Sequence, residues 1–338
     1  MKPAACQVPV VVTLAVCLAA CGGSGPSDGQ PPANPPLEQR VAAAQATAQS
    51  NPLCSTRTLN SYYWEIGDKS GPLASGSIGP EKITADTLMN IASASKWPFA
   101  AYVIEKYGDV PPHVPYLNFT SGYSSFDNTA CPSTATVGQC NSNNNPINQT
   151  ESALGTFHYQ GGHMQQLAVN LGLGGMRVGA LANELASQIG SDAGIAFVKP
   201  LPEGGMRTTA RGYATFLRKL MADSPTPLKL GSILGSHAVC TKPINGCNAS
   251  GDTVAALPEN FHYSLGHWVE DDPTNTPLSN FAYSSAGKFG FYPWISLDRT
   301  LYGIIAREDP TAVATGEGYA SLQCGRLIRA AWRTGIAQ

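Results

Sequence analysis

The chain has 338 residues, enough for one large domain or two closely packed ones with an extensive buried core. Its formal net charge is −2 at pH 7, only 13% of its residues are charged, and it has no basic stripe with interleaved aromatic residues, which argues against nucleic acid as a partner. The 35 glycines and 26 prolines predict many turns and long loops, and argue against a helical bundle.

The N-terminus, residues 1–20, resembles a bacterial signal peptide. Its apolar run over residues 9–20 is too short to span a membrane permanently. The run ends in the letters LAACG, which resemble a lipobox and predict lipidation of Cys21; the alternative is an ordinary cleavage site that contains a cysteine by chance. We interpret residues 21–50 as a lipid anchor and flexible tether, because their first part is rich in Gly, Ser and Pro. The expected location is the periplasmic face of the bacterial cell envelope, with the glycine after the cysteine favouring the outer membrane.

Six cysteines follow the predicted signal peptide and anchor. An even number of cysteines in an exported chain favours disulfides. We expect Cys131–Cys140 and Cys240–Cys247 each to close a short polar loop, and Cys54–Cys324 to tie the start of the mature domain to its last helix. Metal ligation is the alternative, but the sequence has no C-x-x-C pair and its cysteine spacings do not suit zinc. We therefore predict no metal site.

The rest of the chain predicts an α+β domain over residues 51–338. Strands at both ends and helices between them suggest a mainly antiparallel sheet from about 51–92 and 261–338, flanked by terminal helices, with a helical subdomain over about 93–260. The expected strands cover 61–67, 73–79, 288–296 and 301–307, and the expected helices cover 95–106, 161–173, 178–189, 208–221 and 317–333.

Ser93 and Lys96 are the first candidates for catalysis. Three residues apart on a helix, a hydroxyl and an amine lie on one face, close enough to exchange a proton. A serine becomes a good nucleophile when a neighbouring base takes its proton, and a lysine amine can act as that base. The S-x-x-K pattern is weak evidence alone, because Ser285 and Lys288 match it too.

Five segments together resemble the penicillin-recognising serine hydrolases, which include class C β-lactamases, D,D-peptidases, related esterases and nylon-oligomer hydrolases. They occur in the family's order, and this order favours Ser93 over Ser285. The similar segments are Ile83–Leu88 running into Ser93–Lys96, Leu117–Gly122 (L-x-x-T-S-G), Leu154–Tyr159, Gly204–Arg211 (G-G-x-x-S-T-A) and Tyr263–Gly266 (Y-G-L-G).

The resemblance implies roles for particular residues. Ser93 would be the nucleophile that forms an acyl-enzyme, Lys96 would accept or relay its proton, and Tyr159 would help activate the serine and protonate the leaving group. The backbone N–H groups of Ser93 and Lys288 would form the oxyanion hole. The alternative for Tyr159 is an ordinary half-buried tyrosine.

The resemblance also implies a substrate cleft, where the sequence departs from the family pattern. Ser285 stands where the family has the cation or imidazole of its K/H-T-G element, and Gly287 stands at the glycine of that element. Gly161 replaces the asparagine of the Y-x-N element, and His163 could partly stand in for it. A Ser-His-Asp triad that uses a nearby histidine is a further alternative.

These departures from the family pattern change the substrate that we predict. The missing groups ordinarily contact the amide and carboxylate of penicillin or a D-Ala-D-Ala peptide, so we predict a serine hydrolase for carboxylic esters or unusual amides. A D,D-peptidase or weak β-lactamase is one alternative, and a catalytically inactive ligand-binding protein of the envelope is another. No cofactor is expected. The expected partners are a small-molecule ester or amide substrate and the membrane, through the lipid on Cys21.

Overall fold

The computed structural model describes residues 34–108, 111–142, 148–244, 247–249, 258–274, 276–311 and 316–338. The predicted signal peptide, the lipidation site Cys21 and the predicted tether up to residue 33 lie outside the described residues. Within the described ranges, no helix combines the length and the apolar character needed to cross a bilayer.

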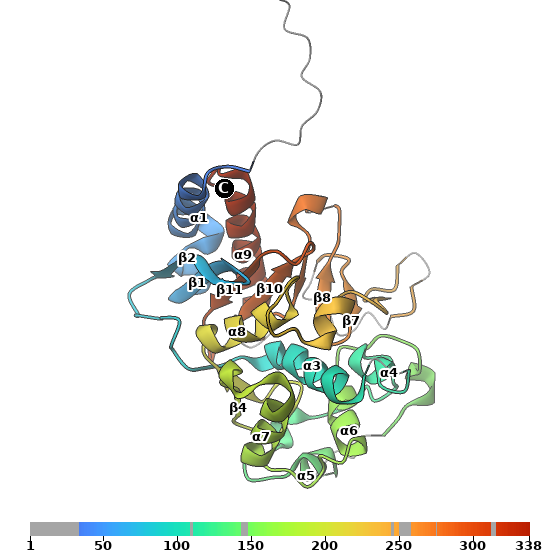
Figure 1. The fold of residues 1–338 in the computed structure, drawn as a ribbon. Helices are drawn as coiled ribbons and strands as arrows, with labels where there is room; N and C mark the ends of the chain where they lie inside the picture. The colour runs from blue at the N-terminus through green and yellow to red at the C-terminus, as the bar shows by residue number, and fades with distance from the viewer. Residues whose placement is uncertain are drawn as a thin grey trace, which may run out of the picture. The chain divides into compact units, whose positions relative to one another are not determined.

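An antiparallel sheet assembled from both ends of the chain forms the centre of the domain (Figure 1). The first strands pair with the last one, since Trp64 of β1 lies opposite Ile305 of β11. Six consecutive residues of β1 are buried, because helices cover both faces of the sheet. The strand order is β2 (Gly71–Ile78), β1 (Tyr62–Asp68), β11 (Tyr302–Ala306), β10 (Tyr292–Ser296), β9 (Ala282–Ser284), β8 (His267–Glu270), β7 (His262–Ser264) and β6 (Val239–Cys240).

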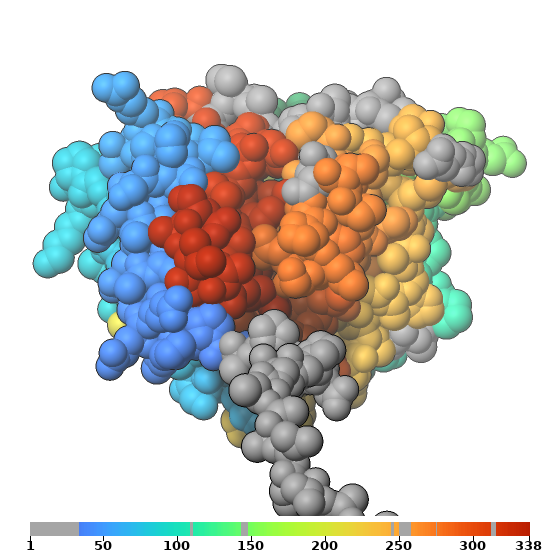
Figure 2. Space-filling view, turned by 90° about the horizontal axis from the view of Figure 1, so that it is seen from above, coloured from blue at the N-terminus to red at the C-terminus, as the bar shows by residue number. Residues whose placement is uncertain are grey.

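The first and last helices, α1 (Leu37–Ser50) and α9 (Gly316–Thr334), lie side by side on one face of this sheet (Figure 2). The prediction of a flexible tether up to residue 50 is therefore wrong from Leu37 onward. Small side chains on α1, such as Ala44 and Ala48, are fully buried and allow close approach to α9. Packing thus stabilises a segment whose composition resembled that of a linker.

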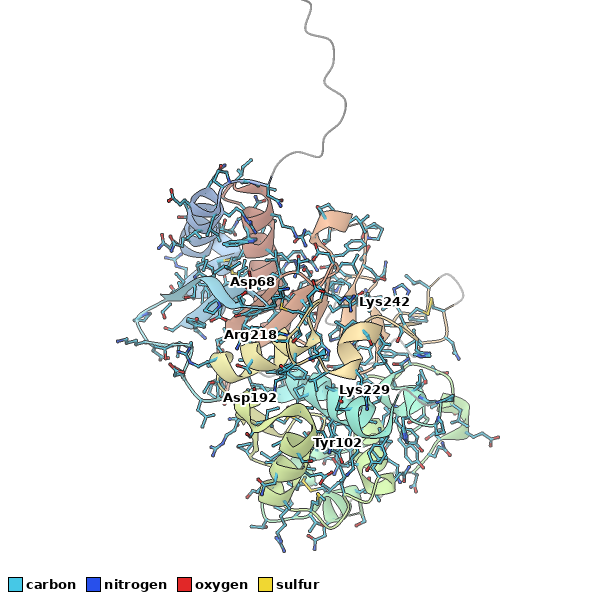
Figure 3. The ribbon with its side chains drawn as sticks, viewed as in Figure 1. Asp68, Tyr102, Asp192, Arg218, Lys229 and Lys242 are labelled. Carbon is cyan, nitrogen blue, oxygen red and sulfur yellow. A yellow bond between two sulfur atoms is a disulfide. The ribbon has the colours of Figure 1, made fainter. Side chains whose placement is uncertain are left out.

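The opposite face of the sheet is covered by α8 (Ala210–Leu220) and leads to the helical region (Figure 1). There Tyr102 lies on α3 (Lys96–Tyr107; Figure 3). Its Oη donates a hydrogen bond of 2.7 Å to Glu184 Oε1 on α7 (Val178–Ile189). The other helices are α2 (Thr56–Leu59), α4 (Val114–Leu117), α5 (Val137–Ser142) and α6 (Gly162–Asn170), and a second sheet has the order β3 (Met89–Asn90), β5 (Met206–Thr208), β4 (Ala196–Phe197).

The predicted strand over residues 288–296 is half wrong. Its first part is a tight turn, in which the Gly290 N–H donates to the Gly287 carbonyl at 2.9 Å and Gly290 has a φ of +104°. A left-handed residue of this kind breaks strand geometry, so β10 begins only at Tyr292. The other expected strands and helices are present with small shifts at their ends.

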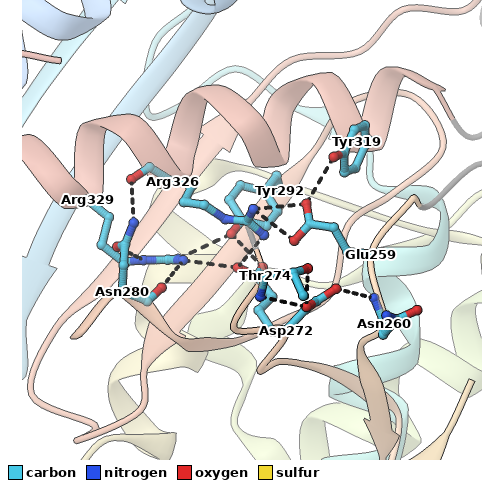
Figure 4. A network of polar contacts seen from close by, with 10 residues as sticks. Glu259, Asn260, Asp272, Thr274, Asn280, Tyr292, Tyr319, Arg326 and Arg329 are labelled. Carbon is cyan, nitrogen blue, oxygen red and sulfur yellow. Dashed lines mark hydrogen bonds and ion pairs between the residues drawn. The ribbon is translucent and has the colours of Figure 1, made fainter. Parts of the chain in front are cut away.

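Covalent and ionic links fasten the two ends of the chain to the sheet. The three predicted disulfides, Cys54–Cys324, Cys131–Cys140 and Cys240–Cys247, are all formed. A buried ionic network joins α9 to β8, β10 and the segment before β7 (Figure 4). In it, Arg329 Nη2 donates to Glu270 Oε2 at 3.0 Å, and Arg326 Nη1 donates to both carboxylate oxygens of Glu259 at 2.9 and 3.0 Å.

Candidate active site

A short turn places Ser93 at the entrance to α3. Residues Ala92–Ser95 form a 3-10 turn that continues directly into the helix. Ala92 has a φ of +44°, which is unfavourable for a residue with a Cβ atom. The Ser95 hydroxyl holds the turn by donating to the Ala92 carbonyl at 2.6 Å and accepting from the Met206 N–H at 3.2 Å. Such strain is characteristic of functional sites.

Ser93 and Lys96 are in direct contact. Lys96 Nζ lies 2.9 Å from Ser93 Oγ. The lysine side chain is buried, with 3% of its surface exposed, whereas Ser93 remains partly accessible. The serine also lies at the N-terminal end of the helix, where unpaired N–H groups and the helix dipole favour a negative charge. A serine hydroxyl with this neighbour can act as a nucleophile.

A buried glutamate completes the surroundings of the lysine. Lys96 Nζ donates to the backbone carbonyl of Glu203 at 2.8 Å and lies 3.3 Å from its Oε2 atom. Only 3% of Glu203 is exposed. Sequence analysis missed this residue, because 107 positions separate it from Lys96 and no local pattern pairs the two. Its one signal was its position, directly before the Gly204-Gly205 pair of the recognised segment.

The Tyr159 ring lies next to the Lys96 amine and packs against several aromatic rings. Lys96 Nζ lies 5.0 Å from the centroid of the Tyr159 ring. The ring is half-buried, and its centroid lies 5.4 Å from that of Phe119, 5.8 Å from that of Tyr263 and 5.0 Å from that of Trp268. These contacts fix the phenol ring beside the Ser93–Lys96 pair, so the structure brings the three predicted catalytic side chains together.

The end of strand β9 lies against the serine from the other side. Ser285 is buried, and its hydroxyl donates to the Ser93 carbonyl at 3.2 Å. A Cβ on Gly287 would lie 2.2 Å from the Ile91 carbonyl, so only glycine fits. Because the Gly287 carbonyl accepts from Gly290, and a trans peptide directs its N–H opposite to its C=O, the Lys288 N–H points away from that turn. The Lys288 N–H is therefore not the donor in the hydrogen bond of the turn, as the predicted oxyanion role requires.

Several solved structures are similar to this chain in fold, although no family model and no curated protein matches the sequence. A putative β-lactamase from Bacteroides dorei is 18% identical, with a TM-score of 0.55, over 79% of this chain and 93% of its own. A β-lactamase/D-alanine carboxypeptidase from Yersinia pestis is 10% identical, with a TM-score of 0.60, over 85% and 98%. A D-amino acid amidase from Ochrobactrum anthropi, in complex with D-phenylalanine, is 12% identical, with a TM-score of 0.59, over 86% and 97%. This chain has the β-lactamase/D,D-peptidase fold. The fold class predicted from the sequence is confirmed.

Glu203 lies against Gly161, the position at which the sequence resemblance leads one to expect an asparagine. A Cβ on Gly161 would lie 2.6 Å from Glu203 Oε1 and 2.7 Å from Glu203 Cγ and Cδ. No side chain can therefore stand at position 161 while Glu203 keeps its place. The glutamate occupies the space that a side chain on Gly161 would need, and it contacts Lys96 from there.

The predictions that His163 lines the substrate cleft and partly replaces the asparagine are wrong. His163 is fully buried, its Nδ1 atom lies 2.7 Å from Ser121 Oγ, and its ring stacks on Phe119 with centroids 5.4 Å apart. Burial, followed by the charge of the nearby His158, lowers the pKa of His163 to about 3. The hydrogen bonds of Lys96 go to Ser93 and Glu203. The histidine packs behind Phe119 as a neutral residue.

Two buried neutral histidines should make the fold sensitive to mild acid. Burial lowers the pKa of His267 as well, to about 3, and its Nε2 atom accepts from the Gly235 N–H at 3.1 Å. Below pH 6.5 the unfolded chain binds protons at both histidines and the folded chain does not. The free energy of unfolding should therefore fall between pH 6.5 and pH 3, by up to about 1.4 kcal/mol per pH unit for each histidine.

Urea denaturation at pH 7.0 and pH 5.0 measures this loss. The variant His267→Gln should show about half the histidine-dependent loss of the wild type, because one of the two titrating groups is gone. An unchanged pH dependence in the variant would contradict the prediction, whatever the absolute stability of the variant.

Proposed function

We propose that this chain is a serine hydrolase that acts through an acyl-enzyme on Ser93. The observation that carries the proposal is the contact of 2.9 Å between the buried Lys96 amine and the partly accessible Ser93 hydroxyl. An isolated serine hydroxyl is a weak nucleophile, and a base within hydrogen-bonding distance is the feature that activates it.

The proposed reaction has two halves. In acylation, the Ser93 proton moves to the Lys96 amine while Oγ bonds to the substrate carbonyl carbon, and the backbone N–H groups of Ser93 and Lys288 stabilise the oxyanion. The bond to the leaving group then breaks, and the leaving group takes a proton from Lys96 or Tyr159. In deacylation, water attacks the acyl carbon and gives a proton to the same groups, which pass a proton to Ser93 Oγ as the acyl bond breaks, so that the acid and the Ser93 hydroxyl are released.

The proposed substrates are carboxylic esters or unusual amides without a carboxylate beside the scissile bond. Ser285 offers no cation to bind such a carboxylate, since its hydroxyl is buried against the Ser93 backbone. Glu203 adds a carboxylate of its own close to the serine. The similarity to a D-amino acid amidase in fold keeps amides without a carboxylate among the candidates.

We further propose that the protein is exported and anchored by a lipid on Cys21 at the periplasmic face of the envelope, in the outer membrane. The three disulfides support an oxidising compartment. Mass spectrometry of the chain from a bacterial membrane fraction tests this, and an unmodified N-terminus at any other residue would contradict it.

Activity-based labelling tests the hydrolase proposal. The mature domain is incubated with a fluorophosphonate probe and, in parallel, with a fluorescent penicillin, and adducts are mapped by mass spectrometry. We expect the fluorophosphonate to label Ser93 and penicillin to give no stable adduct. The variant Ser93→Ala should lose labelling entirely while keeping its urea-denaturation midpoint.

Each other outcome identifies an alternative. A penicillin adduct on Ser93 would favour a D,D-peptidase or a β-lactamase. Labelling of Ser285 would show that the nucleophile is misassigned. No adduct with either probe would favour a ligand-binding protein that has lost its chemistry.

A further inference from the structure

We propose that Glu203 is the positioning residue of the Ser93–Lys96 pair, and that it orients the lysine amine from the space left empty by Gly161. This inference deepens the proposed function and rests on it. It concerns a residue outside the recognised sequence motifs, which the three-dimensional structure alone places beside the lysine.

Counting donors and acceptors supports this role. A neutral lysine amine has two N–H donors and one lone pair. Glu203 supplies two acceptors to Lys96 Nζ, its backbone carbonyl at 2.8 Å and its Oε2 atom at 3.3 Å. When both N–H groups donate to Glu203, the lone pair is left for Ser93 Oγ, the third neighbour, at 2.9 Å. One residue thus fixes the direction in which the amine can accept the serine proton.

Several contacts hold Glu203 in its position. Its carboxylate packs on the backbone at Gly161, where a Cβ would come within 2.6 Å of Oε1. Asn128 Nδ2 lies 3.4 Å from the same oxygen. The segment leading to the glutamate is tied to α6, because Gln165 Nε2 donates to the Pro200 carbonyl at 3.3 Å. A buried carboxylate held in this way costs desolvation energy, and its contact with the Lys96 side chain offsets that cost.

The charge of Glu203 distinguishes it from an amide in the same place. A glutamine at position 203 would keep the backbone carbonyl and a side-chain oxygen as acceptors for Lys96 Nζ, and would remove only the charge. The geometric role of Glu203 can therefore be tested separately from its charge.

Three variants test the role of Glu203, with the rate of fluorophosphonate labelling at Ser93 as the measurement. Glu203→Ala should label roughly 100-fold more slowly than the wild type, because the amine loses its side-chain acceptor. Glu203→Gln should stay within about tenfold of the wild type, because an amide oxygen can accept from the amine in the same place. Adding Gly161→Asn to Glu203→Ala should recover at least about tenfold of the lost rate, because an amide then re-enters the vacated space.

A matched control uses the Lys106–Glu184 pair, which also involves α3 but lies away from the serine and is partly exposed. Glu184→Gln should label at the wild-type rate, and urea denaturation of each variant shows that it is folded. The inference is overturned if Glu203→Ala labels like the wild type, or if Gly161→Asn restores nothing. A wild-type chain that is not labelled at all would overturn the proposed function, and this inference with it.

Discussion

Replacing Lys96 with methionine is expected to slow the acylation of Ser93 by roughly 10³-fold. Methionine is close to lysine in length and buries well, but it has no amine to accept the serine proton. Ser93 Oγ would then lose the contact of 2.9 Å that activates it. The measurement is the rate of fluorophosphonate labelling, and a variant that labels within tenfold of the wild type would show that the lysine is not the base.

The same substitution should also reduce stability, because it leaves the Glu203 carboxylate buried without its partner. Glu203 is 3% exposed, and removing one member of a buried ion pair costs about 3–5 kcal/mol. The double variant Lys96→Met with Glu203→Gln should recover most of the free energy of unfolding, because no unpaired charge remains. It should not recover labelling. Recovery of both would mean that Lys96 contributes only to structure.

The sequence predicts one of these two effects, on labelling, better than the other, on stability. The spacing of Ser93 and Lys96 predicts their proximity, because a local helical turn fixes it. The sequence alone suggests that loss of the lysine would hardly change stability, since nothing in it marks Lys96 as paired. The pairing depends on Glu203, which a long-range fold brings to the lysine.

The same distinction explains the error at His163. A missing asparagine invites a nearby polar residue as its replacement, and His163 is only two positions from Gly161. The helix α6 turns His163 toward Ser121, away from the lysine, and that direction cannot be obtained from sequence distance. The space at Gly161 is filled from a different segment of the chain.

The long helices and strands of the fold could be predicted from the sequence better than the site could. The strands β1 and β2 and the helices α3, α7, α8 and α9 each have seven or more residues, long enough to be recognised in the sequence. The strands β8 and β9 have four and three residues, too few for a pattern. Helix α1 was missed because its stability comes from α9, nearly three hundred residues away along the chain.

Replacing Arg329 with methionine is expected to destabilise the fold by about 3–5 kcal/mol. Arg329 and Glu270 are both 0% exposed, and the guanidinium also donates to Asn280, through Nε to Oδ1 at 2.8 Å and through Nη2 to the backbone carbonyl at 2.7 Å (Figure 4). Burial tends to raise the pKa of Glu270, but the charges of Arg329 and Arg326 outweigh burial and hold this pKa below its ordinary value. Without Arg329, the carboxylate keeps the more distant Arg326, 3.7 Å away, and the Tyr292 hydroxyl.

Helix α9 itself provides the control for this prediction. Arg333 lies one turn after Arg329, and its ion pair with Asp298, 3.5 Å long, is partly exposed to solvent. An exposed pair contributes about 0–1 kcal/mol, so Arg333→Met should leave the urea-denaturation midpoint nearly unchanged. The contrast between the two arginines separates burial of the charge from its mere presence on the helix.

The stability difference between the wild type and Arg329→Met should also depend on pH. A carboxylate whose pKa is lowered by folding stabilises the fold at a pH above its ordinary pKa, and this contribution is lost as the pH falls. The difference in the free energy of unfolding should therefore shrink in acid, once Glu270 is protonated in both proteins. An equal loss of stability in the two variants at pH 7, or a difference that grows in acid, would contradict the assignment of the Arg329–Glu270 pair as a main ionic link between the last helix and the sheet.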